Sequence, residues 1–156
     1  MNILFVCTGN TCRSVLAEYL LKKMAAGKNI QTFSAGIAAN AGTAVPNAVI
    51  NILKEEGVTG VRHTPASLEP KMADGADYIF VMESFHKNYV LERFPAAKNK
   101  TFLMKEFAAR NRKGDETQQI TLEVADPMGS SDEVYRRCFK EIKSALQKIL
   151  EVLPNA

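Results

Sequence analysis

The chain has 156 residues, of which 46% are hydrophobic and 24% are charged. These values are ordinary for one globular domain, so we expect a single domain over residues 1–156. The net charge of +3 is too small to indicate a nucleic acid or an anionic membrane as partner. No apolar run approaches the roughly 20 residues of a membrane span, and the N-terminus lacks the basic stretch of a signal peptide. Three cysteines do not make a disulfide framework, which favours a reduced, cytoplasmic compartment.

Strands and helices are predicted to alternate along the chain. Strands are predicted at 3–6, at 30–33 (broken by Ser34-Ala35-Gly36), at 77–82 and at 101–104. Helices are predicted at 15–24 (ending near Gly27), from Pro46 to Gly57, at 70–74, from 83 or 84 to about 94, and at 105–110, followed by a mobile polar loop at 111–125. A last helix is capped by Ser131-Asp132-Glu133, and its apolar face carries Val134, Cys138, Ile142, Leu146 and Ile149. The strands are apolar in series, which is typical of strands buried on both faces. The alternation predicts an α/β fold, a doubly wound parallel sheet with helices on both faces.

The polar turn Cys7-Thr8-Gly9-Asn10-Thr11-Cys12-Arg13-Ser14 connects the first strand to the first helix. The first N–H groups of a helix are unsatisfied, and the helix dipole favours negative charge near them. In a parallel sheet, ligands bind beyond the carboxyl ends of the strands. The turn is therefore predicted to bind an anion.

Cys7 and Arg13 give this turn the elements of a reactive site. A helix N-terminus and a guanidinium stabilise a thiolate, which is the nucleophilic form of cysteine. The planar guanidinium can hold two oxygens of a phosphoryl group, which a lysine cannot do. Gly9 would allow a close backbone approach or a positive φ, and Ser14 would either cap the helix or donate to the thiolate. A lone cysteine after a strand is more often a small buried apolar residue, but the whole set of residues favours the reactive interpretation.

The turn resembles the C-x5-R-S signature of the low-molecular-weight protein tyrosine phosphatases, with Val15 in place of the usual proline. The resemblance covers nearly the whole chain and implies a four-stranded sheet of order 2-1-3-4. It also implies a bacterial phosphoprotein phosphatase with a phosphocysteine intermediate and with a phosphate site formed by Thr8 to Ser14. The expected ligands are phosphorylated proteins and inorganic phosphate or other oxyanions. We expect a monomer. No cofactor or metal is expected, because the histidines and cysteines have no zinc-site spacing and because the thiolate and Arg13 supply the nucleophile and the charge stabilisation that a metal would provide.

Asp126 is the candidate general acid. A leaving group must be protonated as the thiolate attacks, and a carboxylic acid is the usual donor. By composition alone, Asp126-Pro127 would be a simple turn. The resemblance favours the catalytic interpretation, since the family's general acid precedes a proline late in the chain. The same carboxylate would then activate water against the phosphocysteine.

The resemblance also implies supporting roles for other residues. His63 and Ser34 would form a hydrogen-bond network with Asn10, although His63 could equally be an ordinary loop histidine. Cys12 would form a reversible disulfide with Cys7 that protects the nucleophile from overoxidation; otherwise it is an apolar residue at the helix start. His86 is expected on the surface and Cys138 in the core.

Two positions near the expected phosphate site indicate the substrate. Thr11 replaces the aliphatic residue of tyrosine phosphatases and, by resemblance, marks bacterial protein arginine phosphatases. Met128 follows Asp126-Pro127 where tyrosine phosphatases carry an aromatic pair and arginine phosphatases commonly carry phenylalanine. We therefore favour phosphoarginine over phosphotyrosine as the substrate. Two alternative functions are less favoured. An arsenate reductase would need a close pair of cysteines in the second half of the chain, where only Cys138 is present. An inactive binding module should have lost Cys7 or Asp126, and both are present.

Overall fold

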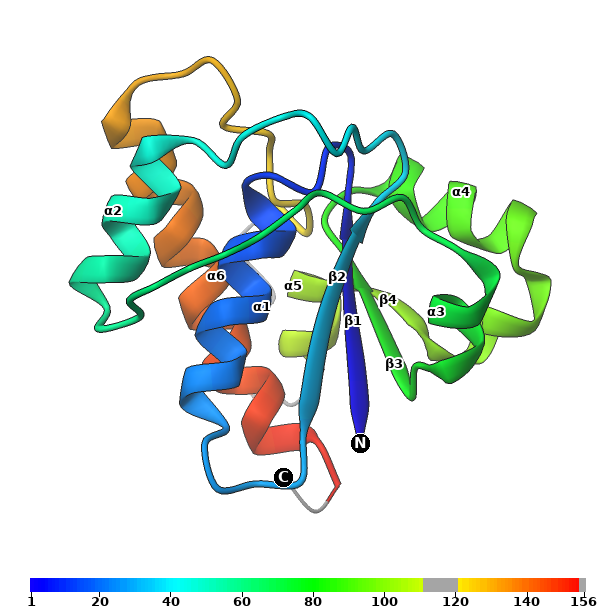
Figure 1. Ribbon diagram of the computed structural model, residues 1–156. Coiled ribbons are helices and arrows are strands. Elements are labelled where there is room, and N and C mark those ends of the chain that lie inside the picture. Colours follow the sequence, from blue (N-terminus) through cyan, green and yellow to red (C-terminus); the bar gives the residue numbers. More distant parts are fainter. Residues whose placement is uncertain (111–120, 155–156) are drawn as a thin grey trace.

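The fold is a four-stranded parallel sheet in the order β2-β1-β3-β4, which confirms the predicted fold class. The computed structural model describes residues 1–110 and 121–154. The strands are β1 (Asn2–Cys7), β2 (Gln31–Gly36), β3 (Tyr78–Val81) and β4 (Thr101–Leu103). In Figure 1 the N-terminus lies at the bottom of β1, and the loop that leads from β1 to the first helix lies at the top. The carboxyl ends of the strands therefore share the upper edge of the sheet.

Helices cover both faces of this sheet (Figure 1). They are α1 (Arg13–Met24), α2 (Asn47–Glu55), α3 (Pro70–Gly75), α4 (Ser84–Arg93), the 3-10 helix η1 (Pro95–Lys100), α5 (Met104–Ala108) and α6 (Asp132–Val152). One hydrophobic core contains residues of α1, α2, α5 and α6, and the other contains residues of α3, α4 and η1. None of the helices in the described ranges has the length and apolar content needed to cross a membrane.

The central strand β1 explains why its sequence is apolar in series. Ile3 and Phe5 pack into the core on the α1 side, and Leu4 and Val6 pack into the core on the α3 side. Successive side chains of a strand point to opposite faces, so a strand covered on both faces needs apolar residues at every position. Both faces together fix β1 rigidly, and the loop after it begins from a fixed point.

Strand β2 is longer than predicted, and the expected break at Ser34-Ala35-Gly36 is wrong. These residues pair in register with the last residues of β1, including Cys7 with Gly36. A Cβ on Gly36 would lie 2.5 Å from the carbonyl oxygen of Thr8. Gly36 thus permits close packing between the strand end and the loop.

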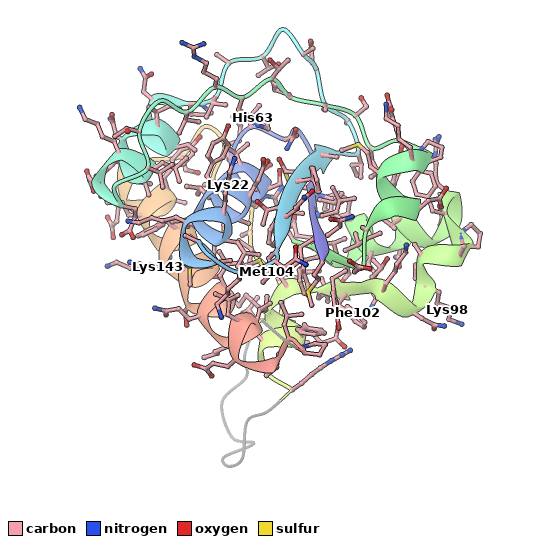
Figure 2. All side chains as sticks on the ribbon, turned by 60° about the horizontal axis from the view of Figure 1, so that its bottom comes forward. Lys22, His63, Lys98, Phe102, Met104 and Lys143 are labelled. Carbon is pink, nitrogen blue, oxygen red and sulfur yellow. The ribbon has the colours of Figure 1, made fainter. Side chains whose placement is uncertain are left out.

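Other boundaries differ by small amounts. Helix α1 begins at Arg13, two residues before the predicted start. In α6, Tyr135 is buried, whereas Val134 of the predicted apolar face is partly exposed. Figure 2 shows Met104 near the centre of the molecule and Lys98 and Lys143 at opposite sides. The predicted polar loop at 111–125 lies mostly outside the described residues, and of its remainder Val124 is buried.

Candidate active site

The loop from Cys7 to Ser14 lies at the carboxyl end of β1, between its neighbours β2 and β3. The chain leaves β1 for β2 on one side and later returns to β3 on the other side. Strand order therefore reverses here, which is where doubly wound sheets bind ligands. Backbone N–H groups of Ile37 and Ala38 hold the start of the loop by donating to the carbonyls of Cys7 and Thr8, at 3.0 and 2.9 Å.

Asn10, and not Gly9, has the left-handed backbone of the loop. The φ of Asn10 is +54°, and the φ of Gly9 is not positive. A Cβ on Gly9 would meet Thr11 Oγ1 at an ordinary 3.6 Å, so close packing does not require a glycine there either. Non-glycine residues rarely adopt this conformation, and asparagine is among those that do. Asn10 is also fully buried, so its side chain is available for internal hydrogen bonds.

The Asn10 side chain directs a hydrogen-bond network towards Cys7. Its Oδ1 accepts from the backbone N–H of Ala66 at 2.9 Å, which identifies the other amide atom as Nδ2. Nδ2 donates to Ser14 Oγ at 2.9 Å and to Ser34 Oγ at 2.8 Å. Ser14 Oγ lies 2.9 Å from Cys7 Sγ, and a thiolate can only accept. Ser14 can therefore donate its own hydrogen to a thiolate at Cys7.

Two further residues complete this network. His63 Nε2 lies 3.1 Å from Asn10 Oδ1, which already acts as an acceptor, so Nε2 is the donor. Ser34 Oγ donates to the carboxylate of Glu18. Burial raises the pKa of Glu18. The structure thus brings together Asn10, Ser34 and His63 as expected and adds Glu18, which sequence reasoning missed although it follows Ser14 by one helical turn.

Arg13 is only 2% exposed and is held by acceptors from three segments. Nη1 pairs with the carboxylate of Glu83 and donates to the Val124 carbonyl at 2.9 Å. Nη2 lies 3.3 Å from Asp126 Oδ2. In the part of the chain that the structure describes, no protein acceptor lies within hydrogen-bond reach of Nε. Nε is thus available to a phosphoryl group, whereas Nη2 faces Asp126 Oδ2 and Thr8 Oγ1.

Asp126 reaches the loop through its ion pair with Arg13, although its side chain is 46% exposed. Its Oδ1 accepts from the backbone N–H of Met128 at 3.1 Å, which holds the acid in a tight turn. Met128 itself is half exposed. The candidate acid and the candidate phosphate ligand are therefore in contact, with Met128 on the outer side of the turn.

Cys12 lies at the N-cap position of α1 and is buried with a free thiol. Burial raises its pKa, and hydrogen bonds between its thiol and the hydroxyls of Thr11 and Tyr135 oppose this shift. Tyr135 OH lies 3.9 Å from Cys12 Sγ. Burial and the nearby Cys12 raise the pKa of Tyr135 to about 12. Cys12 is thus a protonated thiol inside the loop, and Cys138 is a second protonated thiol in the core, where burial raises its pKa to about 12.

His86 is fully buried, so the expectation of a surface residue is wrong. It lies in the first turn of α4, which faces the loop. Its Nδ1 accepts from the backbone N–H of Glu83 at 3.1 Å, and its Nε2 lies 2.8 Å from Thr8 Oγ1. Sequence reasoning also missed Glu83. Glu83 and His86 are three residues apart at a helix start. This spacing is that of a capping box, and it could have indicated that both side chains bond to the first turn of α4.

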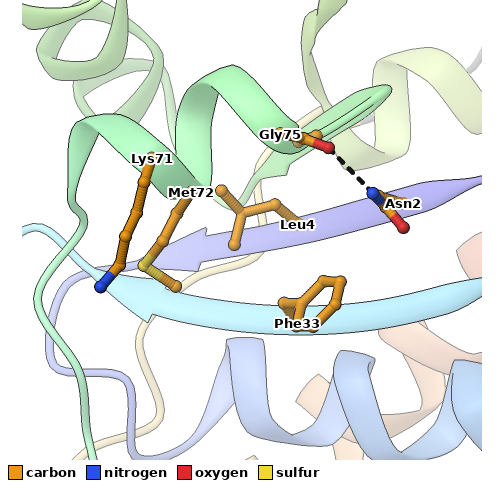
Figure 3. A pocket seen from close by; sticks show the side chains of 7 residues that line it. Asn2, Leu4, Phe33, Lys71, Met72 and Gly75 are labelled. Carbon is orange, nitrogen blue, oxygen red and sulfur yellow. Dashed lines mark hydrogen bonds between the residues drawn. The ribbon is translucent and has the colours of Figure 1, made fainter.

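An apolar cavity of about 240 Å³ lies elsewhere, against β1, β2 and α3 (Figure 3). Leu4, Phe33 and Met72 line it, and Lys71 contributes its stem. Asn2 bonds the Gly75 carbonyl at its border, at 3.0 Å. The cavity contains no nucleophile or acid and shares no residue with the loop.

Comparisons with known proteins give matches over nearly the whole chain. Residues 2–156 match the family model described as low molecular weight phosphotyrosine protein phosphatase. A protein-arginine-phosphatase of Geobacillus stearothermophilus is 38% identical over 97% of this chain and 95% of its own length. The low molecular weight protein-tyrosine-phosphatase PtpB of Staphylococcus aureus is 32% identical over 98% of this chain and 99% of its own length.

A solved structure extends the likeness to the fold. It is the YwlE arginine phosphatase as a cysteine-to-serine mutant with a phosphorylated active site serine, and its TM-score is 0.84. It is 29% identical and the match covers 97% of this chain and 94% of that chain. The family model spans nearly all of this chain, and two relatives exceed 30% identity over almost its full length. The chain therefore belongs to the low molecular weight phosphotyrosine protein phosphatase family.

Proposed function

We propose that this protein dephosphorylates protein side chains and that Cys7 is the nucleophile. The observation that carries the proposal is the oriented network from Ala66 through Asn10 and Ser14 to Cys7 Sγ. Hydrogen bonding to the charged form of a group stabilises that form. The N-terminus of α1 begins within the same loop and adds its dipole. A related arginine phosphatase has been solved with phosphate on the serine that replaces its active site cysteine, which supports the same role for Cys7.

The proposed reaction has two steps. The Cys7 thiolate attacks phosphorus while Arg13 and the loop N–H groups bind the phosphoryl oxygens. The bond to the leaving group breaks, and protonated Asp126 gives the leaving atom its proton. In the second step the Asp126 carboxylate takes a proton from water, and the resulting hydroxide attacks the phosphocysteine. Inorganic phosphate leaves, and Cys7 is again a thiolate.

Phosphoarginine is the proposed substrate class. Thr11 is buried, and among the described residues its hydroxyl makes only a weak 3.6 Å contact, with Cys12 Sγ. Its oxygen can still accept from an N–H of a phosphoguanidinium, which an aryl phosphate lacks. Met128 gives the outer wall no aromatic ring, and this removes about 0.5–1.5 kcal/mol of stacking on a phenol ring. The arginine phosphatase of G. stearothermophilus, at 38% identity, supports the same choice.

The test is the ratio of kcat/KM on matched phosphoarginine and phosphotyrosine peptides. We expect the wild type to favour phosphoarginine and Thr11→Ile to reverse the preference, because isoleucine removes the acceptor. Thr101→Val is the matched control, since Thr101 is a buried threonine of β4 whose hydroxyl bonds the Ala97 carbonyl. A wild-type preference for phosphotyrosine that Thr11→Ile leaves unchanged would contradict phosphoarginine and leave a tyrosine phosphatase.

A further inference from the structure

The hydroxyl of Thr8 and the imidazole of His86 form a buried pair beside the phosphate loop. Thr8 Oγ1 lies 2.8 Å from His86 Nε2. The other ring nitrogen, Nδ1, lies 3.1 Å from the backbone nitrogen of Glu83. A backbone N–H can only donate, so Nδ1 is an acceptor without a proton. The proton of the neutral ring is therefore on Nε2, and His86 donates to Thr8.

The surroundings of His86 keep the ring neutral. The ring is fully buried, and the exposed Phe85 side chain lies against it with the ring centroids 4.1 Å apart. Burial and the positive charge of Arg13 lower the pKa of His86 to about 4, against smaller opposing effects of Asp126 and Glu123. The Nε2–H of His86 is consequently a fixed donor at neutral pH.

A second donor lies near Thr8 Oγ1. Arg13 Nη2 lies 3.5 Å from it, and the same Nη2 lies 3.3 Å from Asp126 Oδ2. Two donors occupy the two lone pairs of the hydroxyl oxygen. Within residues 1–110 and 121–154, the hydrogen of the Thr8 hydroxyl has no acceptor. That hydrogen is left for a ligand beside Arg13 and Asp126.

We propose that Thr8 donates this hydrogen to an oxygen of the bound phosphoryl group and that His86 is a positioning residue that sets the direction of the Thr8 hydroxyl. This inference rests on the proposed phosphatase function and adds a ligand contact to it. If His86 did not donate, the hydroxyl hydrogen could turn inward to the ring nitrogen and would be lost to the ligand. The imidazole therefore acts on the substrate only through Thr8.

Affinity for inorganic phosphate, measured by calorimetry and as competitive inhibition of p-nitrophenyl phosphate hydrolysis, tests the proposal. Thr8→Val should weaken phosphate binding by about tenfold, as expected for one hydrogen bond to a charged group. Thr8→Ser should stay within about twofold of wild type, because it keeps the hydroxyl. Thr101→Val, which removes a buried hydroxyl from β4, should have no effect.

The His86 variants separate positioning from structure. In His86→Asn the side-chain oxygen can still accept from Glu83, but the amide is too short to reach Thr8, so the loss should match that of Thr8→Val. His86→Gln carries an N–H near the position of Nε2 and should restore much of the affinity. The double variant of Thr8→Val with His86→Asn should be no weaker than Thr8→Val alone.

Two results would overturn the proposal: unchanged phosphate affinity in Thr8→Val, or losses that multiply in the double variant. Melting temperatures of all variants identify any that fail to fold. A wild type that binds phosphate but does not hydrolyse p-nitrophenyl phosphate contradicts the proposed function and leaves the Thr8 contact testable by calorimetry. An active wild type with an unaffected Thr8→Val contradicts this inference alone.

Discussion

Acidification should destabilise the folded protein through the buried ring of His86. In the folded state, burial and the charge of Arg13 lower the pKa of His86 from 6.5 to about 4. A second proton on the ring would also displace the hydrogen bond from the Glu83 backbone to Nδ1. The folded state therefore resists protonation, whereas an unfolded chain has an exposed histidine that protonates near its ordinary pKa.

The sign and size of the effect follow from proton linkage. Between pH 6.5 and about 4 the unfolded state binds the extra proton and the folded state does not. The free energy of unfolding therefore falls as the pH falls through this window, and it is independent of His86 above the window. The pKa difference corresponds to about 3 kcal/mol, with a limiting slope of about 1.4 kcal/mol per pH unit.

Urea unfolding of wild type and His86→Gln from about pH 7 to about pH 4 measures this effect. Glutamine keeps an N–H near the position of Nε2 and does not titrate. Titrating carboxylates affect both proteins, so the difference between the two curves isolates His86. The wild type should lose about 3 kcal/mol more than the variant on acidification. Parallel curves, or an NMR titration of His86 with a midpoint near its ordinary pKa, would refute the reasoning.

Three further variants test the site. Glu83→Gln removes the carboxylate that holds Arg13 and should lower kcat/KM by about tenfold or more. The control Glu69→Gln, from an exposed pair with a lysine, should leave kcat/KM unchanged. Equal kcat/KM values for the two variants would show that the Glu83 contact is dispensable. Asp126→Asn should slow basic leaving groups by about 10²-fold or more and good ones far less, and equal losses would assign Asp126 to structure. Peroxide should inactivate wild type and Cys12→Ser, with dithiothreitol restoring only the wild type; recovery of both would exclude a protective Cys12.

The fold and the centre of the site could be predicted from the sequence because each depends on a local pattern of residues. The apolar runs and their alternation with helices predicted the parallel sheet, and the spacing of Cys7 and Arg13 predicted the loop. Both predictions depend on residues that are consecutive in the sequence. The role of Asp126 as the acid, by contrast, was expected only through the family resemblance, and its contact with Arg13 was not predicted.

The remaining parts depend on contacts between distant segments. Gly36 was taken for a strand break because the close carbonyl of Thr8 is invisible in the sequence. His86 was placed on the surface because a histidine in a short polar helix is usually exposed. Its burial follows from how the start of α4 faces the loop, which only the packing of the sheet determines. Tyr135 was missed for the same reason, since it reaches Cys12 from the last helix.

Rapid-quench mass spectrometry of the protein during turnover tests the nucleophile most directly. With p-nitrophenyl phosphate as substrate, the account predicts a phosphoryl group on the peptide that contains Cys7. It should accumulate in Asp126→Ala, because that variant lacks the carboxylate that activates water. Cys12→Ser should carry the same adduct, and Cys7→Ser should show no turnover. An adduct on another residue, or hydrolysis by Cys7→Ser within about tenfold of wild type, would contradict the mechanism.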